Sequence, residues 1–130
     1  MWIAVVLLVL AGAALAVIGG LSVQGRLPRN PWAGLRTHNI MASDEAWYAA
    51  HDAGGPWLLA AAGMCFITAV LTFVTTGHAW TRTVDALLVG LIAGFLIVGM
   101  VFGEQAAKRV LRAQGIEIGP RGRKGPRPGS

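Results

Sequence analysis

Three long stretches without charge constrain this chain more than any other feature of its sequence. They run from Trp2 to Val23, from Trp57 to Thr76 and from Ala86 to Gly103, and none of them contains Asp, Glu, Lys or Arg. A helix of about 20 apolar residues is long enough to cross the roughly 30 Å hydrocarbon core of a bilayer. We therefore predict an all-α integral membrane protein with three transmembrane helices.

The three stretches divide the chain into one membrane domain and a tail. We expect a single transmembrane domain over residues 1–115, with spans at about 2–23, 57–76 and 84–104. No basic segment precedes the first stretch, which favours a retained helix over a cleaved signal peptide. The third helix should continue to about Ala113 and end at Gly115. The basic tail, residues 116–130, is rich in Gly, Pro and Arg and should be disordered.

A polar interval, residues 24–55, separates the first two spans; we call it the motif loop. Its first half combines arginines with helix-breaking residues, which favours a compact turn: Arg26, Pro28, Arg29, Pro31, Gly34 and Arg36. The second half is helical in character, because Ser43 can cap backbone amides and two acidic residues follow it. Gly54, Gly55 and Pro56 should end this helix. We predict a short amphipathic interfacial helix between the first and second spans.

The motif loop also carries a family signature. The run N-P-W-A-G-L-R-T at 30–37, followed by Ser43, Trp47 and His51, resembles that of the SdpI family, a bacterial membrane family named for an immunity protein against a secreted peptide toxin. Ile40 stands where the family usually has Thr. The resemblance implies an immunity-like or signal-linked role in the bacterial cytoplasmic membrane. It marks these candidate binding or structural residues: Asn30, Pro31, Trp32, Gly34, Arg36, Thr37, Ser43, Trp47 and His51.

Two interpretations of this signature remain open. In the first, it folds the loop: Asn30 bonds its own turn, Gly34 takes a positive φ, and Arg36 holds helix-end carbonyls or lipid phosphate. Trp47 and His51, four residues apart on one helix face, would then wedge at the headgroup level. In the second, a partly exposed rim of Arg, Trp and Tyr docks a partner protein.

Charge predicts the orientation in the membrane. With three spans, the motif loop and the tail lie on one side, and the N-terminus and the second connection on the other. The second side carries Arg82 alone, whereas the first carries ten basic residues: Arg26, Arg29, Arg36, Lys108, Arg109, Arg112, Arg121, Arg123, Lys124 and Arg127. Because cytoplasmic loops are rich in Lys and Arg, we expect the motif loop and tail in the cytoplasm and the N-terminus outside.

The polar residues of the motif loop do not form a pattern typical of catalysis or metal binding. The candidates are His38, Asp44, Glu45, His51 and Asp52. The positions one helical turn before and after His51 hold Trp47 and Gly55, so no second ligand is in register. No phosphate-binding or hydrolase motif is present. We expect no enzyme, no metal and no cofactor, and a protein that acts by binding.

The spans themselves also lack patterns that indicate catalysis or transport. They contain no ionisable side chain of the kind that lines a transport route, so a small transporter is the least favoured class. Thr68, Thr72, Thr75 and Thr76 can bond to carbonyls of their own helix. Cys65 is the only cysteine, which excludes an intramolecular disulfide.

The remaining features indicate partners. Gly90 and Gly94, and likewise Gly99 and Gly103, form G-x-x-x-G pairs that permit close helix packing. Lys108, Arg109 and Arg112 are candidates for contacts with lipid or a partner. Because the basic residues gather beside the membrane and in the tail, we expect no nucleic acid partner. Membrane lipid, a membrane protein or a second copy fits better, and an accessory subunit of a larger complex is the alternative function.

Overall fold

The computed structural model describes residues 2–30 and 32–116, and that part of the chain is helical, with no strand. The expectations for Pro31 and for residues 117–130 of the tail lie outside the described residues.

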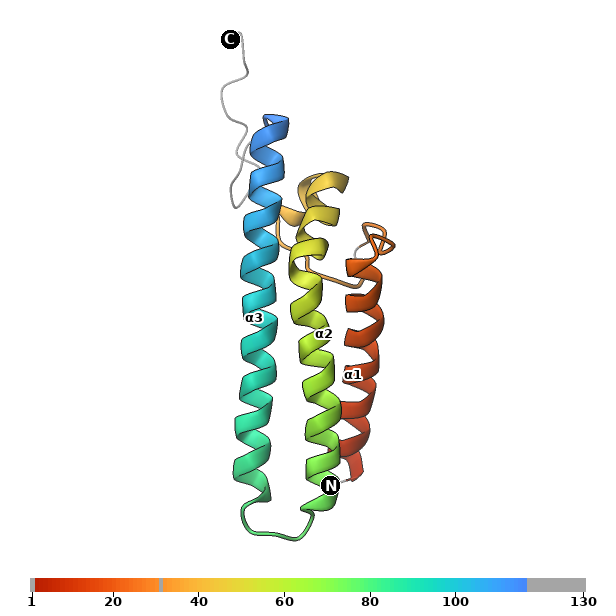
Figure 1. Ribbon diagram of the computed structural model, residues 1–130, viewed down its shortest axis with the longest axis vertical. Coiled ribbons are helices and arrows are strands. Elements are labelled where there is room, and N and C mark those ends of the chain that lie inside the picture. Colours follow the sequence, from red (N-terminus) through yellow and green to blue (C-terminus); the bar gives the residue numbers. More distant parts are fainter. Residues whose placement is uncertain (1, 31, 117–130) are drawn as a thin grey trace.

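Three long helices dominate the structure (Figure 1). They are α1 (Trp2–Val23), α2 (Asp44–Val74) and α3 (Thr81–Gln114), and a 3-10 turn, η1 (Ile40–Ala42), precedes α2. By length and composition, each of the long helices can cross a membrane. The prediction of three membrane-length helices is therefore confirmed.

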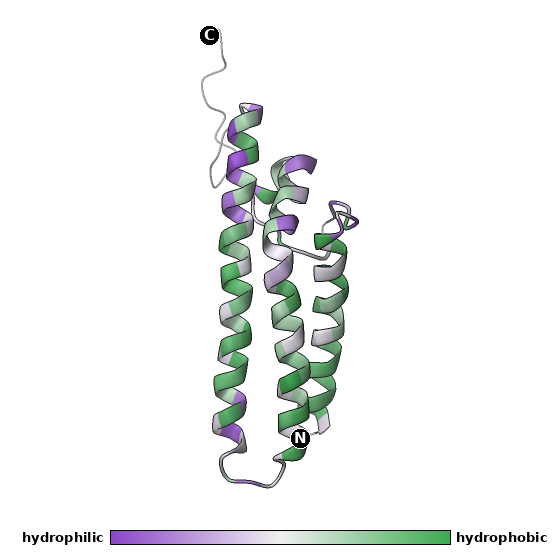
Figure 2. Ribbon diagram, viewed as in Figure 1, coloured by the Kyte–Doolittle hydropathy of each residue, from purple (hydrophilic) through white to green (hydrophobic). Residues whose placement is uncertain are grey.

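Two of the helices are longer than a bilayer requires. α2 has 31 residues and α3 has 34, so they extend about 46 and 51 Å against a hydrocarbon core of roughly 30 Å. Hydrophilic colour gathers where α2 begins and α3 ends, beside the motif loop (Figure 2). Residues 44–56 and 104–114 therefore form a polar end beyond the apolar spans.

The helices stand in a row with α2 in the middle (Figure 1). α2 packs against both neighbours, whereas α1 and α3 do not approach each other closely over the described part of the chain. The connection between α2 and α3 is short and makes them antiparallel. Hydrogen bonds hold this turn, because Thr81 Oγ1 donates to the carbonyl of Thr75 at 2.5 Å and Thr72 Oγ1 donates to Asp85 Oδ1 at 2.7 Å.

The prediction of a separate interfacial helix is wrong, because α2 runs without interruption from Asp44 to Val74. Pro56 removes one hydrogen bond, to the carbonyl of Asp52, but that exposed residue lies at the polar end. Gly54 and Gly55 do not end the helix. They lie where neighbouring elements pass too close for a side chain, so they permit helix packing instead.

The helix ends follow the local sequence. Gly115 has φ +70° and ends α3, as predicted. The amide of Ile116 donates to the carbonyl of Leu111 at 2.9 Å and the amide of Gly115 to that of Arg112 at 3.2 Å, which is a Schellman motif. Gly25 ends α1 in the same way.

The threonines of α2 and of the two positions that follow it behave largely as expected. Thr68, Thr75 and Thr76 donate to the carbonyls four residues before them, at 2.7 to 2.8 Å. Thr72 does not, because its hydroxyl reaches Asp85 on α3 instead.

Among the described residues, the larger of two clusters of buried apolar residues lies mainly at the polar end. Its members join the motif loop, the start of α2 and the end of α3: Leu27, Leu35, Ile40, Ala46, Trp47, Ala50, Leu58, Ala107 and Leu111. Lipid can cover apolar side chains within a bilayer, but beyond it such side chains must bury one another. The larger buried core therefore lies at the base of the motif loop, and a smaller one, formed by Ala61, Cys65 and Ile92, joins α2 and α3 within the apolar spans.

Candidate functional site

The motif loop begins with a turn built by Asn30. Its Oδ1 accepts hydrogen bonds from the amides of Trp32 at 2.9 Å and Ala33 at 2.7 Å, and its Nδ2 donates to the carbonyl of Pro28 at 2.8 Å. This is the local bonding expected of Asn in a turn. The turn leaves Trp32 pointing outward, with 83% of its surface exposed.

Arg29 attaches this turn to the start of α2. Its Nη1 donates to the carbonyl of Met41 at 3.2 Å, and its Nε lies 3.1 Å from Asp44 Oδ1. Ser43 caps α2, as predicted, by accepting from the amide of Ala46 at 3.1 Å. Both members of the Arg29–Asp44 pair are partly exposed, so the pair contributes at most about 1 kcal/mol.

His51 fixes the centre of the loop. Its Nε2 accepts from the amide of Leu35 at 2.9 Å, and its Nδ1 lies 2.7 Å from the carbonyl of Trp47. One nitrogen must accept and the other must donate, so the ring is neutral with its proton on Nδ1. The Trp47 ring lies against this ring at a centroid distance of 4.1 Å, tilted by 31°, and donates from Nε1 to the carbonyl of Leu27 at 2.8 Å.

Trp47 and His51 share a helix face as expected, but that face is buried. Their exposed fractions are 0% and 1%. The expectation that they wedge at the headgroup level is therefore wrong, because the motif loop folds over them. His51 lies beyond the apolar span, and burial lowers its pKa, an effect partly opposed by the hydrogen bond to Trp47.

Gly34 allows the loop to reach His51. Its φ is +105°, a conformation that side chains rarely adopt. A Cβ on Gly34 would overlap His51 Nε2. The glycine of the signature therefore serves both the turn and the contact.

Leu35, the next residue, inserts between α2 and α3. It is buried, and its Cδ1 would lie 2.7 Å from a Cβ on Gly54 and 2.8 Å from one on Gly103. A Cβ on Gly54 would also lie 2.8 Å from the carbonyl oxygen of Gly99. These glycines let the two helices and the loop meet at one point.

Not all the glycines expected at helix contacts make them. Gly99 and Gly103 lie against α2. A Cβ added at Gly99 would lie 3.0 Å from Trp57 Cβ, and one added at Gly103 would lie 3.1 Å from the carbonyl oxygen of Ala50. Gly90 and Gly94 have open space where a side chain would stand.

Glu104 is a site residue that the sequence analysis missed. It extends from α3 to the loop, where Thr37 Oγ1 donates to Oε2 and Asn39 Nδ2 donates to Oε1 at 2.5 Å. Thr37 Oγ1 also accepts from the amide of Ile40 at 3.2 Å. An acidic residue directly after a long apolar stretch was the available signal, but nothing in the sequence placed it opposite residue 37.

The end of α3 also contacts the start of α2. Ser43 Oγ donates to Gln114 Oε1 at 2.9 Å. A hydrogen bond from Gln114 lowers the pKa of Glu45, which stands beyond the span in the first turn of α2. Contacts between the loop, α2 and α3 thus hold the polar end together.

The remaining candidates lie on the surface of the polar end. Arg36, Arg109 and Arg112 are exposed and Lys108 is half-buried. Over residues 2–30 and 32–116, no group of three or more His, Cys, Asp and Glu side chains is placed to hold a metal ion.

Three membrane-length helices, joined at one end by a loop folded on a buried His–Trp pair, define a small α-helical membrane protein. The model of the SdpI/YfhL protein family matches residues 26–103, which cover the motif loop from Arg26, all of α2 and most of α3, and the chain belongs to this family. Neither a curated protein nor a solved structure matches the chain.

Proposed function

We propose that this chain is a small SdpI-like protein of the bacterial cytoplasmic membrane that acts by binding and has an immunity-like role. The observation that carries the proposal is how the signature is used. His51 and Glu104, which could have served chemistry, both hold the motif loop in place by hydrogen bonds. The motif loop and its anchor on α3 therefore support a rigid surface rather than a reactive cavity.

The surface that this loop presents fits a protein partner. Trp32 is 83% exposed at the tip of a turn that Asn30 fixes, so the backbone that carries its indole need not be ordered on binding. Trp and Arg are enriched at protein interfaces and at their energetic centres. Arg109 and Arg112 add exposed basic charge at the same end of the molecule.

We further propose that this polar end faces the cytoplasm. The excess of basic residues on the side of the motif loop and the tail supports this orientation, with Arg82 alone on the other side. A secreted toxin would then be countered within the bilayer or through a partner, not by direct capture at the motif loop.

Expression of the chain alone tests the immunity role. A susceptible bacterium carrying the gene should survive a secreted peptide toxin of the kind that gave the family its name. Trp32→Ala should lose protection while reaching the membrane in normal amounts, and Trp80→Ala, which removes another exposed tryptophan at the opposite end of the molecule, is the matched control. Survival equal to that of cells with an empty vector would contradict the proposal.

A second candidate, an accessory subunit, is favoured by the uncovered surface of α3. Gly90 and Gly94 have no neighbour where a side chain would stand, although such pairs permit close helix contact. An accessory subunit should co-purify with a partner in fixed ratio in mild detergent, and Gly90→Leu should prevent this co-purification. Protection by the chain alone would favour the immunity role instead.

A further inference from the structure

α1 and α2 pack closely only along part of their length. A Cβ added at Gly12 would lie 3.1 Å from Cys65 Cβ, and one added at Gly19 would lie 3.0 Å from Leu59 Cγ. Before Gly12, α1 contains no glycine, so larger side chains separate the helices near the N-terminus.

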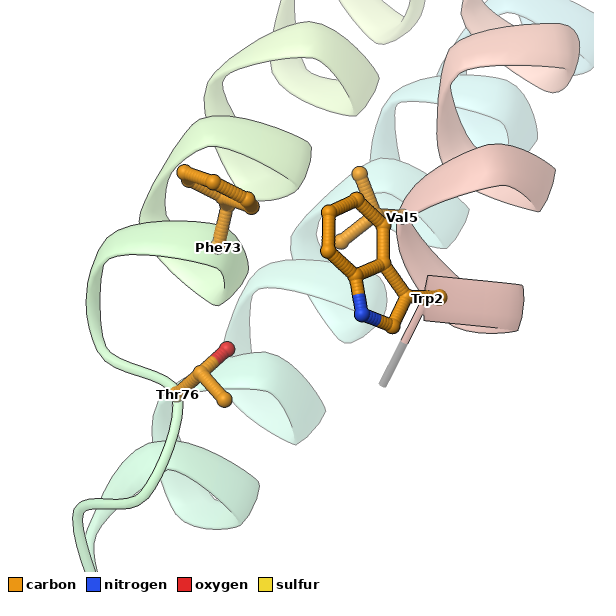
Figure 3. A pocket seen from close by; sticks show the side chains of 4 residues that line it. All are labelled: Trp2, Val5, Phe73 and Thr76. Atoms are coloured by element: carbon orange, nitrogen blue, oxygen red, sulfur yellow. The ribbon is translucent and has the colours of Figure 1, made fainter.

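This separation leaves an apolar groove between the two helices, which we call the α1–α2 groove. It has a volume of about 400 Å³ and is lined by Trp2, Val5 and Val9 of α1 and Phe66, Ala69, Val70 and Phe73 of α2. A pocket of about 180 Å³ shares three of these residues and adds Thr76 (Figure 3). The rings of Trp2 and Phe73 lie 5.7 Å apart across the pocket.

The polarity of the groove changes along its length. Its lining is almost entirely carbon except at the end, where the indole nitrogen of Trp2 and the hydroxyl of Thr76 stand (Figure 3). The Thr76 hydroxyl donates to the carbonyl of Thr72 at 2.8 Å, which leaves its oxygen as an acceptor. This end is level with the start of α1 and the end of α2, where a bilayer changes from hydrocarbon to headgroup.

The volume of the groove distinguishes between its possible occupants. An apolar cavity of about 150 Å³ holds benzene, so 400 Å³ corresponds to roughly sixteen carbon atoms on the same scale. From Phe66 to Thr76 the groove follows about 15 Å of helix, and a second helix about 10 Å wide would need roughly 1,200 Å³ over that length. The volume of the groove therefore matches a single hydrocarbon chain, and a whole helix could not lie inside it.

We propose that the α1–α2 groove binds one acyl chain of a phospholipid, with the ester and glycerol region beside Trp2 and Thr76. The apolar walls accept the chain, and the indole N–H and the threonine oxygen meet the polar groups that follow it. This site does not depend on the proposed immunity role.

The test measures phosphatidylglycerol binding to the full-length, delipidated protein in mild detergent by native mass spectrometry. One lipid should bind to the wild type. Val70→Trp fills the groove and should weaken binding about tenfold. Val74→Trp is the matched control, because Val74 is 67% exposed against 60% for Val70 and does not line the groove. Equal binding to both variants would overturn the proposal.

A second variant keeps the test decisive if Val70→Trp folds poorly. Trp2→Phe retains an aromatic ring but removes the indole N–H and shortens the ring system, so it should weaken phosphatidylglycerol binding several-fold with unchanged helix content by circular dichroism. Unchanged affinity in Trp2→Phe would refute the role of the indole. A wild-type dimer that Val70→Trp converts to monomer, without loss of lipid, would show that a second copy occupies the groove.

Discussion

The motif loop depends on a contact between two single residues, Gly34 and His51. The loop passes so close to the histidine that no side chain fits at position 34. The histidine in turn accepts the amide of Leu35, a group that would be costly to bury without a partner. Two residues 17 positions apart therefore determine the path of the chain between α1 and α2.

Gly34→Ala should destabilise the protein more than Gly25→Ala. Both glycines have positive φ, but a Cβ at Gly25 meets nothing within 4 Å. We expect a loss of about 1 to 2 kcal/mol for Gly25→Ala from backbone strain alone. Gly34→Ala should lose about 2 to 5 kcal/mol, because the clash with His51 adds to the strain. Unfolding in sodium dodecyl sulfate measures both, and equal losses would show that the contact is unimportant.

The burial of His51 predicts a dependence of stability on pH. Its pKa is lowered in the folded protein, below the value of about 6.5 expected when unfolded. Between these two pKa values the unfolded chain binds the proton and the folded protein does not, so stability falls as pH decreases below about 6.5. Thermal unfolding between pH 5.5 and 8 should show this decrease.

His51→Gln should flatten this pH profile, because Gln can still accept from Leu35 but does not titrate in this range. His78→Gln, on the exposed connection, is the control and should keep the wild-type profile. Identical profiles for wild type and His51→Gln would assign the effect to another group.

At the scale of elements, the motif loop joins all three helices at the polar end. It leaves α1, crosses α2 and reaches Glu104 on α3 (Figure 1). Since α1 and α3 do not approach each other closely in the described part, they are linked only through α2 and through the loop. Residues of the signature hold this path, and Leu35 fills the space between α2 and α3.

Glu104→Ala should release the loop from α3. Removing the carboxylate leaves the Thr37 hydroxyl and the buried Asn39 amide without this acceptor, at a cost of about 1 to 3 kcal/mol each. Hydrogen exchange of residues 34–42 should rise sharply, while the apolar part of α2 stays protected. Gln105→Ala, at the adjacent exposed position, should leave the exchange unchanged. Unchanged exchange in Glu104→Ala would contradict this assignment.

Two glycines of the same helix should respond in opposite directions. Gly54→Ala places a Cβ 2.8 Å from the carbonyl oxygen of Gly99 and should separate α2 from α3, with a loss of about 1 to 3 kcal/mol. Gly63→Ala meets nothing within 4 Å and should be neutral or stabilise by up to about 1 kcal/mol, because Ala favours helix. Unfolding in sodium dodecyl sulfate compares them, and a stabilising Gly54→Ala would contradict the close contact.

The whole molecule has a polar end and an apolar shaft with different sources of stability. In the shaft, lipid covers the outward faces of a row of three helices, and glycines set how closely the helices approach. At the polar end, the hydrophobic effect applies, and the larger of the two buried clusters lies there. We expect the polar end to respond to pH and polar substitutions, and the shaft to respond to changes in side-chain size.

The proposed orientation can be tested on intact cells. In a Cys65→Ala background, Gln24→Cys marks the motif loop and His78→Cys marks the second connection, both at exposed positions. A membrane-impermeant maleimide should label His78→Cys and spare Gln24→Cys until the cells are opened, because basic residues gather on the side of the motif loop. Labelling of Gln24→Cys in intact cells would reverse the orientation.

Several features were predictable because each depends on residues that are neighbours in sequence. The membrane-length helices follow from runs without charge, and the end of α3 follows from Gly115. The cap at Ser43 and the turn at Asn30 each need only a side chain that bonds the amides just after it. Trp47 and His51 share a face because they are one helical turn apart.

The sequence by itself determined that this protein is a set of three apolar helices with a structured polar loop, because length, charge and local hydrogen bonding act along the chain. Only the tertiary structure decided that α2 is continuous through Gly54 and Gly55, that His51 is buried and that Glu104 receives the loop. A glycine that ends a helix and one that admits a neighbour are identical in sequence. They differ only in what lies within a few ångströms of the missing side chain.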